Sequence, residues 1–140
     1  MATNKDCILY LDDIKAQLIE EFPTNKELTE KNFLMVYNFV CTDFNGVSEN
    51  KIFRIFLNTF KDVIEFSFQN DASKSYMRTI FKKLNNKKVL DYLSVYMPAK
   101  STVIKFIMDR FVNFFVYQQD LSISKEYKLK EIVDFVNEYI

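Results

Sequence analysis

The sequence predicts an all-α fold, a single-domain bundle of about seven helices that spans residues 1–140 and surrounds one hydrophobic helix. One Gly and two Pro are far fewer turn residues than sandwiches, barrels or α/β folds require. Hydrophobic residues make up 49% of the chain and include fifteen Phe, which is enough for a continuous core at this length. No linker interrupts the helical patterns, so we expect one domain.

The helix expected at the centre runs from Val103 to Tyr117, where eleven of fifteen residues are apolar. Its polar residues Lys105, Asp109 and Asn113 are four apart and form one thin line on a helix. A helix that is apolar on most sides must be enclosed by protein or lipid. Because the run is shorter than the roughly 20 residues of a membrane span and carries charges, we expect protein around it and no membrane span in this chain.

The first two helices are predicted over about Asp6–Phe22 and Thr24–Phe44. Pro23 separates them, because the residue before a proline disfavours helical geometry. Thr24 and the glutamate three residues later have capping-box spacing, so Thr24 is the expected start of the second helix. Gly46 stands where a left-handed C-terminal cap is expected.

The third helix is predicted from Glu49 to about Gln69, with Ser48 as its N-cap. Two adjacent apolar stripes on it indicate a buried face wider than simple two-layer packing requires. The first stripe consists of Ile52, Ile55, Phe56, Thr59, Val63 and Phe66. The second consists of Phe53, Leu57, Phe60, Ile64 and Phe68.

Four further helices complete the predicted bundle. They are expected over about residues 74–84, 87–97, 103–117 and 125–139. Pro98 ends the second of these four, and Ser101 is the expected N-cap of the hydrophobic helix. The stretch 118–124 is polar and is predicted to be a link rather than a helix.

The composition argues against an enzyme. The chain contains no His, which removes the commonest general base and metal ligand and excludes His-dependent serine or cysteine triads. A single Gly leaves no phosphate-cradling loop and no dinucleotide-binding fingerprint. Cys7 and Cys41 lie in apolar helical patterns and are expected to be small buried side chains. We therefore expect no enzymatic activity, no metal site and no cofactor.

The sequence also indicates where the protein acts. Two cysteines form no dense disulfide framework, and the N-terminus lacks the sustained apolar segment of a signal peptide. We therefore expect an intracellular, cytoplasmic protein. Phe, Ile, Lys, Asn and Tyr, whose codons are A/T-rich, are abundant, as in proteins from A/T-rich genomes such as those of many poxviruses. For a viral protein the expected location is the host cytoplasm.

A basic segment gives one functional hypothesis. Between Asp71 and Asp91 there are six basic residues and no acidic one, and the first three are four apart on one helix face. Such a stripe is typical of sequence-independent binding to phosphates. Zero net charge favours the alternative, a solvated helix face. The six residues are Lys74, Arg78, Lys82, Lys83, Lys87 and Lys88.

The aromatic content gives a second functional hypothesis. Aromatic residues make up 16% of the chain, and an exposed apolar groove for a partner's amphipathic helix would use such side chains. Surplus apolar surface is expected on the third helix and the one after it. The alternative for each residue is a place in the core. The candidate groove residues are Phe53, Leu57, Phe60, Ile64, Phe81 and Leu84.

One hydrophobic helix, Val103–Tyr117, wrapped by about six amphipathic helices resembles the Bcl-like fold, in particular its divergent poxviral members. The Asn-Trp-Gly-Arg motif of that family should fall near Lys100–Val103, where none of its four residues occurs. The arginine that pairs with the aspartate of a death-motif ligand is therefore absent at that place. The resemblance implies a regulator of protein partners, as in the poxviral members that lack the motif and act on innate signalling adaptors.

Together these observations predict a non-enzymatic protein-interaction module. Its expected form is a pathogen-encoded Bcl-like regulator of host apoptosis or innate immune signalling that sequesters a partner, an amphipathic helix, through an apolar groove. One alternative is a nucleic-acid-binding helical factor that uses the basic stripe Lys74–Lys88. The other is a structural protein that self-associates as a homodimer through the exposed part of the third helix.

Overall fold

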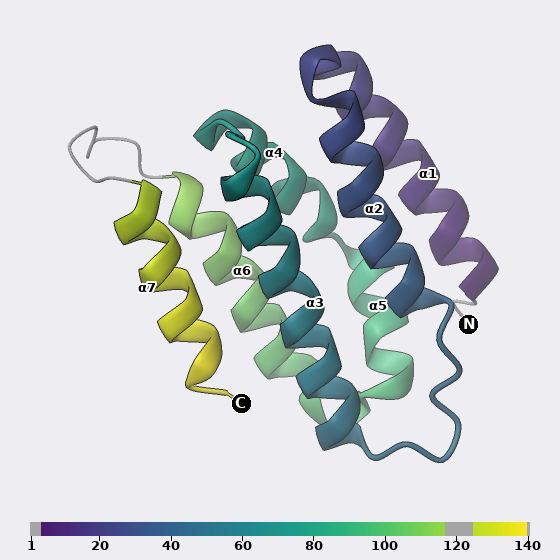
Figure 1. Cartoon of the computed structure of the whole chain (residues 1–140). Helices are drawn as coiled ribbons and strands as arrows, with labels where there is room; N and C mark the ends of the chain where they lie inside the picture. The colour runs from purple at the N-terminus through teal and green to yellow at the C-terminus, as the bar shows by residue number, and fades with distance from the viewer. Residues whose placement is uncertain (1–3, 117–124, 140) are drawn as a thin grey trace.

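The computed structural model describes residues 4–116 and 125–139, and the predicted all-α class is confirmed for them: they form seven α-helices and no strand. Two short 3₁₀ turns, Pro23–Asn25 and Pro98–Lys100, precede the second and the sixth helix. The helices are α1 (Asn4–Glu21), α2 (Lys26–Val40), α3 (Glu49–Gln69), α4 (Lys74–Leu84), α5 (Lys87–Tyr96), α6 (Ser101–Val116) and α7 (Lys125–Asn137) (Figure 1).

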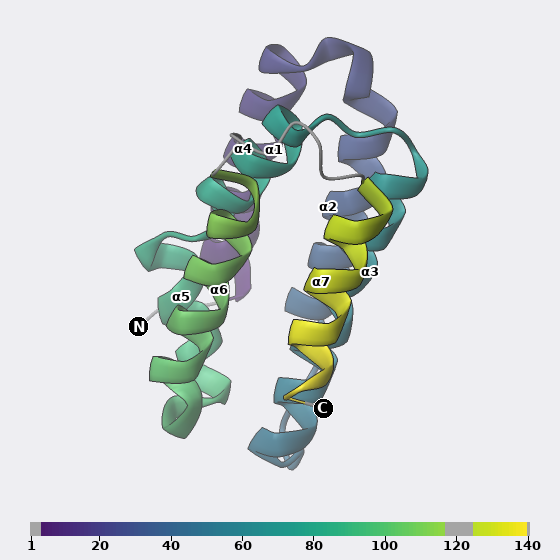
Figure 2. The ribbon, with the colours of Figure 1, turned by 90° about the vertical axis from the view of Figure 1, so that its left-hand side faces the viewer.

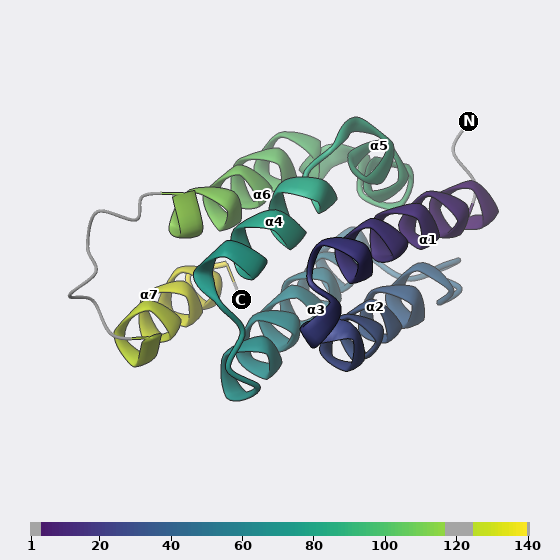
Figure 3. The same ribbon diagram turned by 90° about the horizontal axis from the view of Figure 1, so that it is seen from above.

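The helices form two layers that face each other. In one layer α2, α3 and α7 lie side by side, and in the other α4, α5 and α6 pack together (Figures 2 and 3). The first helix, α1, packs against α2 and also contacts α4 and α5, so it closes one side of the bundle. At the opposite side, α6 and α7 form the edges of their layers, with α7 packed mainly against α3.

The two layers meet in an aromatic core. The ring of Phe60 in α3 lies 6.2 Å from that of Phe81 in α4 and 6.3 Å from that of Phe111 in α6. Phe81 also stacks on Phe115 at 6.0 Å. Fully burying one such side chain contributes about 1.5–3 kcal/mol. Both predicted stripes of α3 supply residues to this core, so the wide buried face is confirmed.

The predicted helix starts are confirmed where a serine side chain accepts a hydrogen bond from a main-chain amide. Ser48 accepts one from the Lys51 amide at 3.3 Å, and Ser73 accepts one from the Tyr76 amide at 3.0 Å. The predicted capping box at Thr24 is wrong, because Pro23 begins a 3₁₀ turn and α2 starts only at Lys26 without a side-chain cap. Ser101 likewise follows a 3₁₀ turn and is already helical, so it is not the expected N-cap.

The end of α2 also differs from the prediction. The helix stops at Val40 rather than near Phe44, and Gly46 lies in the following loop with φ +78° instead of capping the helix. Phe44 is buried outside the helix, with its ring 5.2 Å from Phe39 and 5.6 Å from Tyr96. The loop is thus held to the bundle by an aromatic contact that helical continuation would not have provided.

The solvent-facing side of α6 is wider than the sequence indicated. The face of α6 that carries Ile107, Met108 and Phe111 is buried against neighbouring helices. Besides the predicted polar line, however, Phe106 and Arg110 are exposed, Phe106 by 53%. The cause is the position of α6 at the edge of its layer, where only α7 stands on that side. None of the described helices is both long and apolar enough to cross a membrane.

Candidate functional site

The six residues predicted to line a groove are all in the core. Their exposed fractions range from 0% to 6%. The reason is the place of α3 in the middle of its layer, where α2 and α7 flank it and the α4–α6 layer covers it. The six residues therefore do not form an open groove in the described structure, although Phe53 borders a hollow between α3 and the Pro98–Lys100 turn. The residues are Phe53, Leu57, Phe60, Ile64, Phe81 and Leu84.

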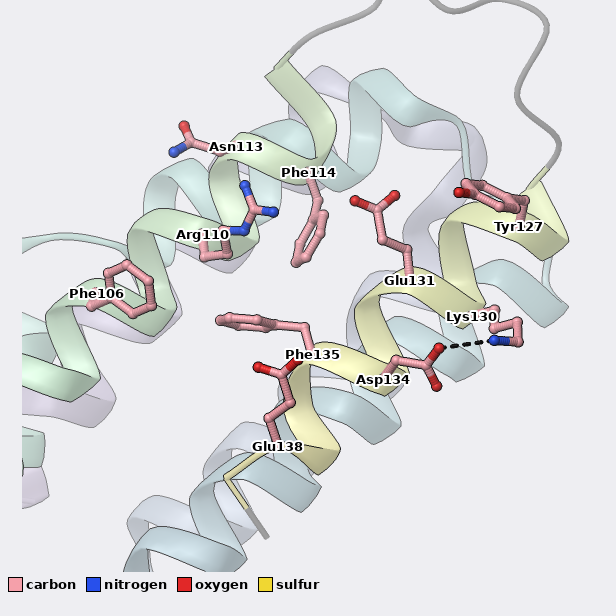
Figure 4. Close-up of a pocket in the computed structure, with 10 residues that line it drawn as sticks. All are labelled: Phe106, Arg110, Asn113, Phe114, Tyr127, Lys130, Glu131, Asp134, Phe135 and Glu138. Atoms are coloured by element: carbon pink, nitrogen blue, oxygen red, sulfur yellow. Dashed lines mark hydrogen bonds and ion pairs between the residues drawn. The ribbon is translucent and has the colours of Figure 1, made fainter.

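Exposed apolar surface occurs elsewhere, at the edge between α6 and α7. Five large hydrophobic side chains of the described residues are exposed, and two of them, Phe106 and Tyr127, line the same groove. The groove has a volume of about 690 Å³. Its walls are α6 and α7, which run in opposite directions along it (Figure 4). None of its lining residues belongs to the groove predicted from the sequence, and this groove is the candidate site.

The floor of the groove is aromatic. Phe114 of α6 and Phe135 of α7 meet edge to face at 5.6 Å, and Phe106 lies 6.3 Å from Phe135. The Arg110 guanidinium lies 4.8 Å from the Phe114 ring and 5.9 Å from the Phe135 ring. Cation–π contacts of this kind contribute about 0.5–1 kcal/mol when exposed. They hold the cation above the rings, at the open side of the groove.

The charges on the two walls differ. The α6 wall carries Arg110, which has no carboxylate within 4.0 Å among the described residues. The opposite wall carries Glu131 and Asp134 of α7 and Glu138 in the turn after it, against two cations of α7: Lys130, which lines the groove, and Lys128, whose Nζ lies 5.9 Å from the Phe114 ring. Of these acids, Glu138 makes no ion pair with a described residue. One wall is thus basic and the other mainly acidic.

Two ion pairs within α7 fix part of this charge. Lys130 donates to Asp134 at 2.9 Å, and this hydrogen bond raises the pKa of the lysine. Lys128 lies 3.5 Å from Glu131, a looser pair. Because water screens exposed charges, the Lys130–Asp134 pair orients its side chains more than it stabilises the helix. Figure 4 shows the carboxylates of Glu131 and Glu138 directed toward the groove.

The groove exists because α7 is fastened to α3 rather than to α6. Ile132 and Val136 of α7 are fully buried, and the Tyr139 ring meets Phe53 of α3 at 6.4 Å. Contacts of α7 with α6 are sparser and pass mainly through Phe135. A signal was present in the sequence, since Phe106 and Arg110 lie on the same helical face, but the opposite wall comes from the next helix, which begins only at Lys125.

The six basic residues of the alternative hypothesis lie along α4 and the start of α5. Several of them are already engaged within the chain. Lys83 donates to Gln17 at 2.8 Å, Lys87 pairs with Asp91 at 2.9 Å, and Lys88 lies 4.9 Å above the Tyr10 ring. The side chains of Lys74 and Arg78 are half-buried, whereas Lys82 is exposed. The stripe therefore presents less available charge than the sequence alone suggested.

The two cysteines differ in their surroundings. Cys7 is buried as expected, and burial together with nearby Cys41 raises the pKa of its thiol to about 11. The expectation that Cys41 is buried is wrong, because α2 ends at Val40 and leaves Cys41 exposed at the helix terminus. Among the residues described, no group of three or more His, Cys, Asp or Glu is arranged to hold a metal ion.

Comparison with known proteins adds no further guidance. The chain matches no protein-family model, no curated protein and no solved structure. The function has to be argued from the geometry of the chain alone.

Proposed function

We propose that this chain is a non-enzymatic protein-interaction module whose binding surface is the groove between α6 and α7. The observation that carries the proposal is Phe106, a large aromatic side chain that is 53% exposed in a groove with an aromatic floor. An exposed apolar groove bordered by charges is characteristic of protein–protein contact sites.

The chemistry of the groove fits an amphipathic helix. Phe106, Phe114 and Phe135 offer an apolar strip for side chains repeated at helical spacing. Arg110 and the acids of α7 form a rim that would orient the bound helix and raise its association rate. Central aromatic anchors, rather than the rim, would supply most of the binding free energy.

In its most concrete form, the proposal is a pathogen-encoded Bcl-like regulator of host apoptosis or innate immune signalling, which sequesters its partner in this groove. The seven packed helices that residues 4–116 and 125–139 form support that proposal. The site would differ from the one first expected, because the candidate groove residues of the third helix are buried.

The test is affinity capture from host-cell lysate with the purified chain, at low and high salt and with nuclease. Phe106→Glu is expected to abolish retention of the bound protein. Leu34→Glu is the matched control, because Leu34 on α2 is 57% exposed and does not line the groove. Retention that resists high salt and nuclease and is lost only with Phe106→Glu supports the proposal. Equal retention by both variants would refute it.

The same experiment decides the nucleic-acid alternative. If retention disappears with salt and nuclease in the unaltered chain, the basic stripe is the better explanation. Reversing Lys82, Lys83, Lys87 and Lys88 to Glu would then abolish the activity.

A further inference from the structure

The groove between α6 and α7 has two walls of opposite charge, and each wall carries an unmatched group. Arg110 on α6 has no carboxylate within 4.0 Å among the described residues, and Glu138, in the turn directly after α7, makes no ion pair there. Both side chains line the same groove without reaching each other. A surface with one basic and one acidic wall is complementary to a copy of itself in which the walls are exchanged.

A two-fold axis that runs along the groove produces this exchange. Rotation by 180° about such an axis places α6 of one copy over α7 of the other, and the reverse, at unchanged height along the groove. Arg110 lies 5.9 Å from Phe135, so it stands at the level of Phe135 on the opposite wall. Glu138 follows Phe135 by three residues, in the turn directly after α7, and lines the same groove. Arg110 of each copy would thus face Glu138 of the other.

We infer that the α6–α7 groove is the interface of a two-fold homodimer, with a second copy of this chain as its occupant. The inference rests on the proposed function in that it uses the same groove, and it names one occupant of it. Phe106 of each copy packs over the aromatic strip of the other, which removes its exposed ring from water. By symmetry the interface contains two ion pairs, each between Arg110 of one copy and Glu138 of the other. These pairs fix how the two copies are aligned along the groove.

This dimer differs from the one considered from the sequence. That expectation placed the contact on the exposed part of the third helix, whereas most of the apolar residues in the two stripes of α3 are buried. The edge of the bundle, where α6 and α7 each have one uncovered side, provides the surface instead.

The experiment is sedimentation of the purified chain over concentrations from about 1 μM to about 1 mM, a range that covers weak to moderate dimers. We expect a monomer–dimer equilibrium. Arg110→Glu and Glu138→Arg should each weaken dimerisation at least about tenfold, because each reversal creates two like-charge contacts by symmetry. Lys51→Glu, a charge reversal at an exposed site on α3 outside the groove, should leave the equilibrium unchanged.

Mixing the two weakened variants gives the decisive result. In a heterodimer of Arg110→Glu with Glu138→Arg, one copy carries Glu at both positions and the other Arg at both, so both reciprocal contacts are again between opposite charges. The mixture should therefore dimerise although neither variant does so alone. Phe106→Ser should weaken the dimer without any change of charge. Circular dichroism of each variant verifies that it is folded.

A monomer at every concentration, or a mixture no more associated than its components, would overturn the inference. Equal weakening by Lys51→Glu would do the same, since it would indicate a general effect of net charge. None of these results decides the proposed function, which lysate capture tests separately. Conversely, a dimer together with capture that Phe106→Glu does not affect would refute the proposed function and retain the inference.

Discussion

The hydroxyl of Tyr92 in α5 donates a hydrogen bond of 2.7 Å to the main-chain carbonyl of Val40, 52 residues earlier in the chain. Val40 is the last residue of α2, where the final carbonyls of a helix have no partner within the helix. The contact is buried, and burial raises the pKa of Tyr92 above its ordinary value. One side chain thus closes the end of α2 and ties the two layers together.

Tyr92→Phe removes this donor and leaves the Val40 carbonyl buried without a partner. We expect the free energy of unfolding to fall by about 1–2 kcal/mol, the cost of an unsatisfied buried acceptor. Urea denaturation followed by circular dichroism measures the change. Tyr96→Phe is the matched control, because no hydrogen bond of its hydroxyl occurs in the described structure, and it should alter stability by less than about 0.5 kcal/mol. Equal losses of stability in Tyr92→Phe and Tyr96→Phe would contradict a stabilising role for the hydrogen bond from Tyr92 to Val40.

A second buried polar cluster joins α2, α3 and α4. The hydroxyls of Thr29 and Tyr76 are 2.9 Å apart, and the Asn32 side-chain amide donates to Ser67 at 2.9 Å and to Tyr76 at 3.3 Å. Thr29→Val and Tyr76→Phe should each cost about 1–3 kcal/mol, because each leaves a buried partner unsatisfied. The double variant should cost less than the sum of the single ones. Strict additivity in this cycle would show that the two hydroxyls do not interact.

The carboxylate of Asp109 gives the stability a pH dependence. It accepts hydrogen bonds from Lys105 at 2.6 Å and from Asn85 at 2.8 Å, and these bonds lower the pKa of Asp109 below its ordinary 3.8. A depressed folded-state pKa stabilises the fold above the unfolded pKa, and this stabilisation is lost as the pH falls through the folded pKa.

Asp109→Asn should therefore lower the free energy of unfolding by about 0.5 kcal/mol near pH 7, a size typical of half-exposed charged pairs. The difference from the unaltered chain should shrink as the pH falls through the lowered pKa of Asp109, because protonation removes the charge. Urea denaturation at neutral and at acidic pH measures it. A difference that grows as the pH falls would contradict the sign of the shift.

The two thiols should react at very different rates. Cys41 is exposed, whereas Cys7 is buried with its pKa raised to about 11, so little of it is thiolate near neutral pH. An alkylating reagent at about pH 8 should modify Cys41 in the folded chain and Cys7 only after urea unfolding. Mass spectrometry of the digested chain identifies the site. Cys41→Ser is the control and should leave the folded chain unmodified.

Local signals explain which parts of the fold were predictable. The bounds of α3 were predicted correctly because Ser48 caps its start and its apolar stripes are long and regular. Cys41 and Gly46 were misplaced because the end of α2 depends on Phe44 packing against Tyr96, a contact across fifty residues. The six candidate groove residues were correctly predicted to lie on apolar helix faces. Whether such a face is exposed or buried depends on how the two layers pack against each other.

The candidate site was not predictable for the same reason. Periodicity places Phe106 and Arg110 on one side of a helix, yet it does not state whether another helix covers that side. Whether α7 packs against α6 or against α3 is decided by the burial of Ile132 and Val136 and by the ring of Tyr139. These are long-range packing choices, and no short motif in the chain encodes them.

The half-exposed ring at position 106 also has an optical consequence. The chain contains eight Tyr and no Trp, so Phe106→Trp would introduce its only indole and place it in the groove. Its emission would shift to shorter wavelength when the groove is covered and to longer wavelength when it opens, without background from other indoles. A single emission spectrum would then report whether the groove between α6 and α7 is shielded from water or exposed to it.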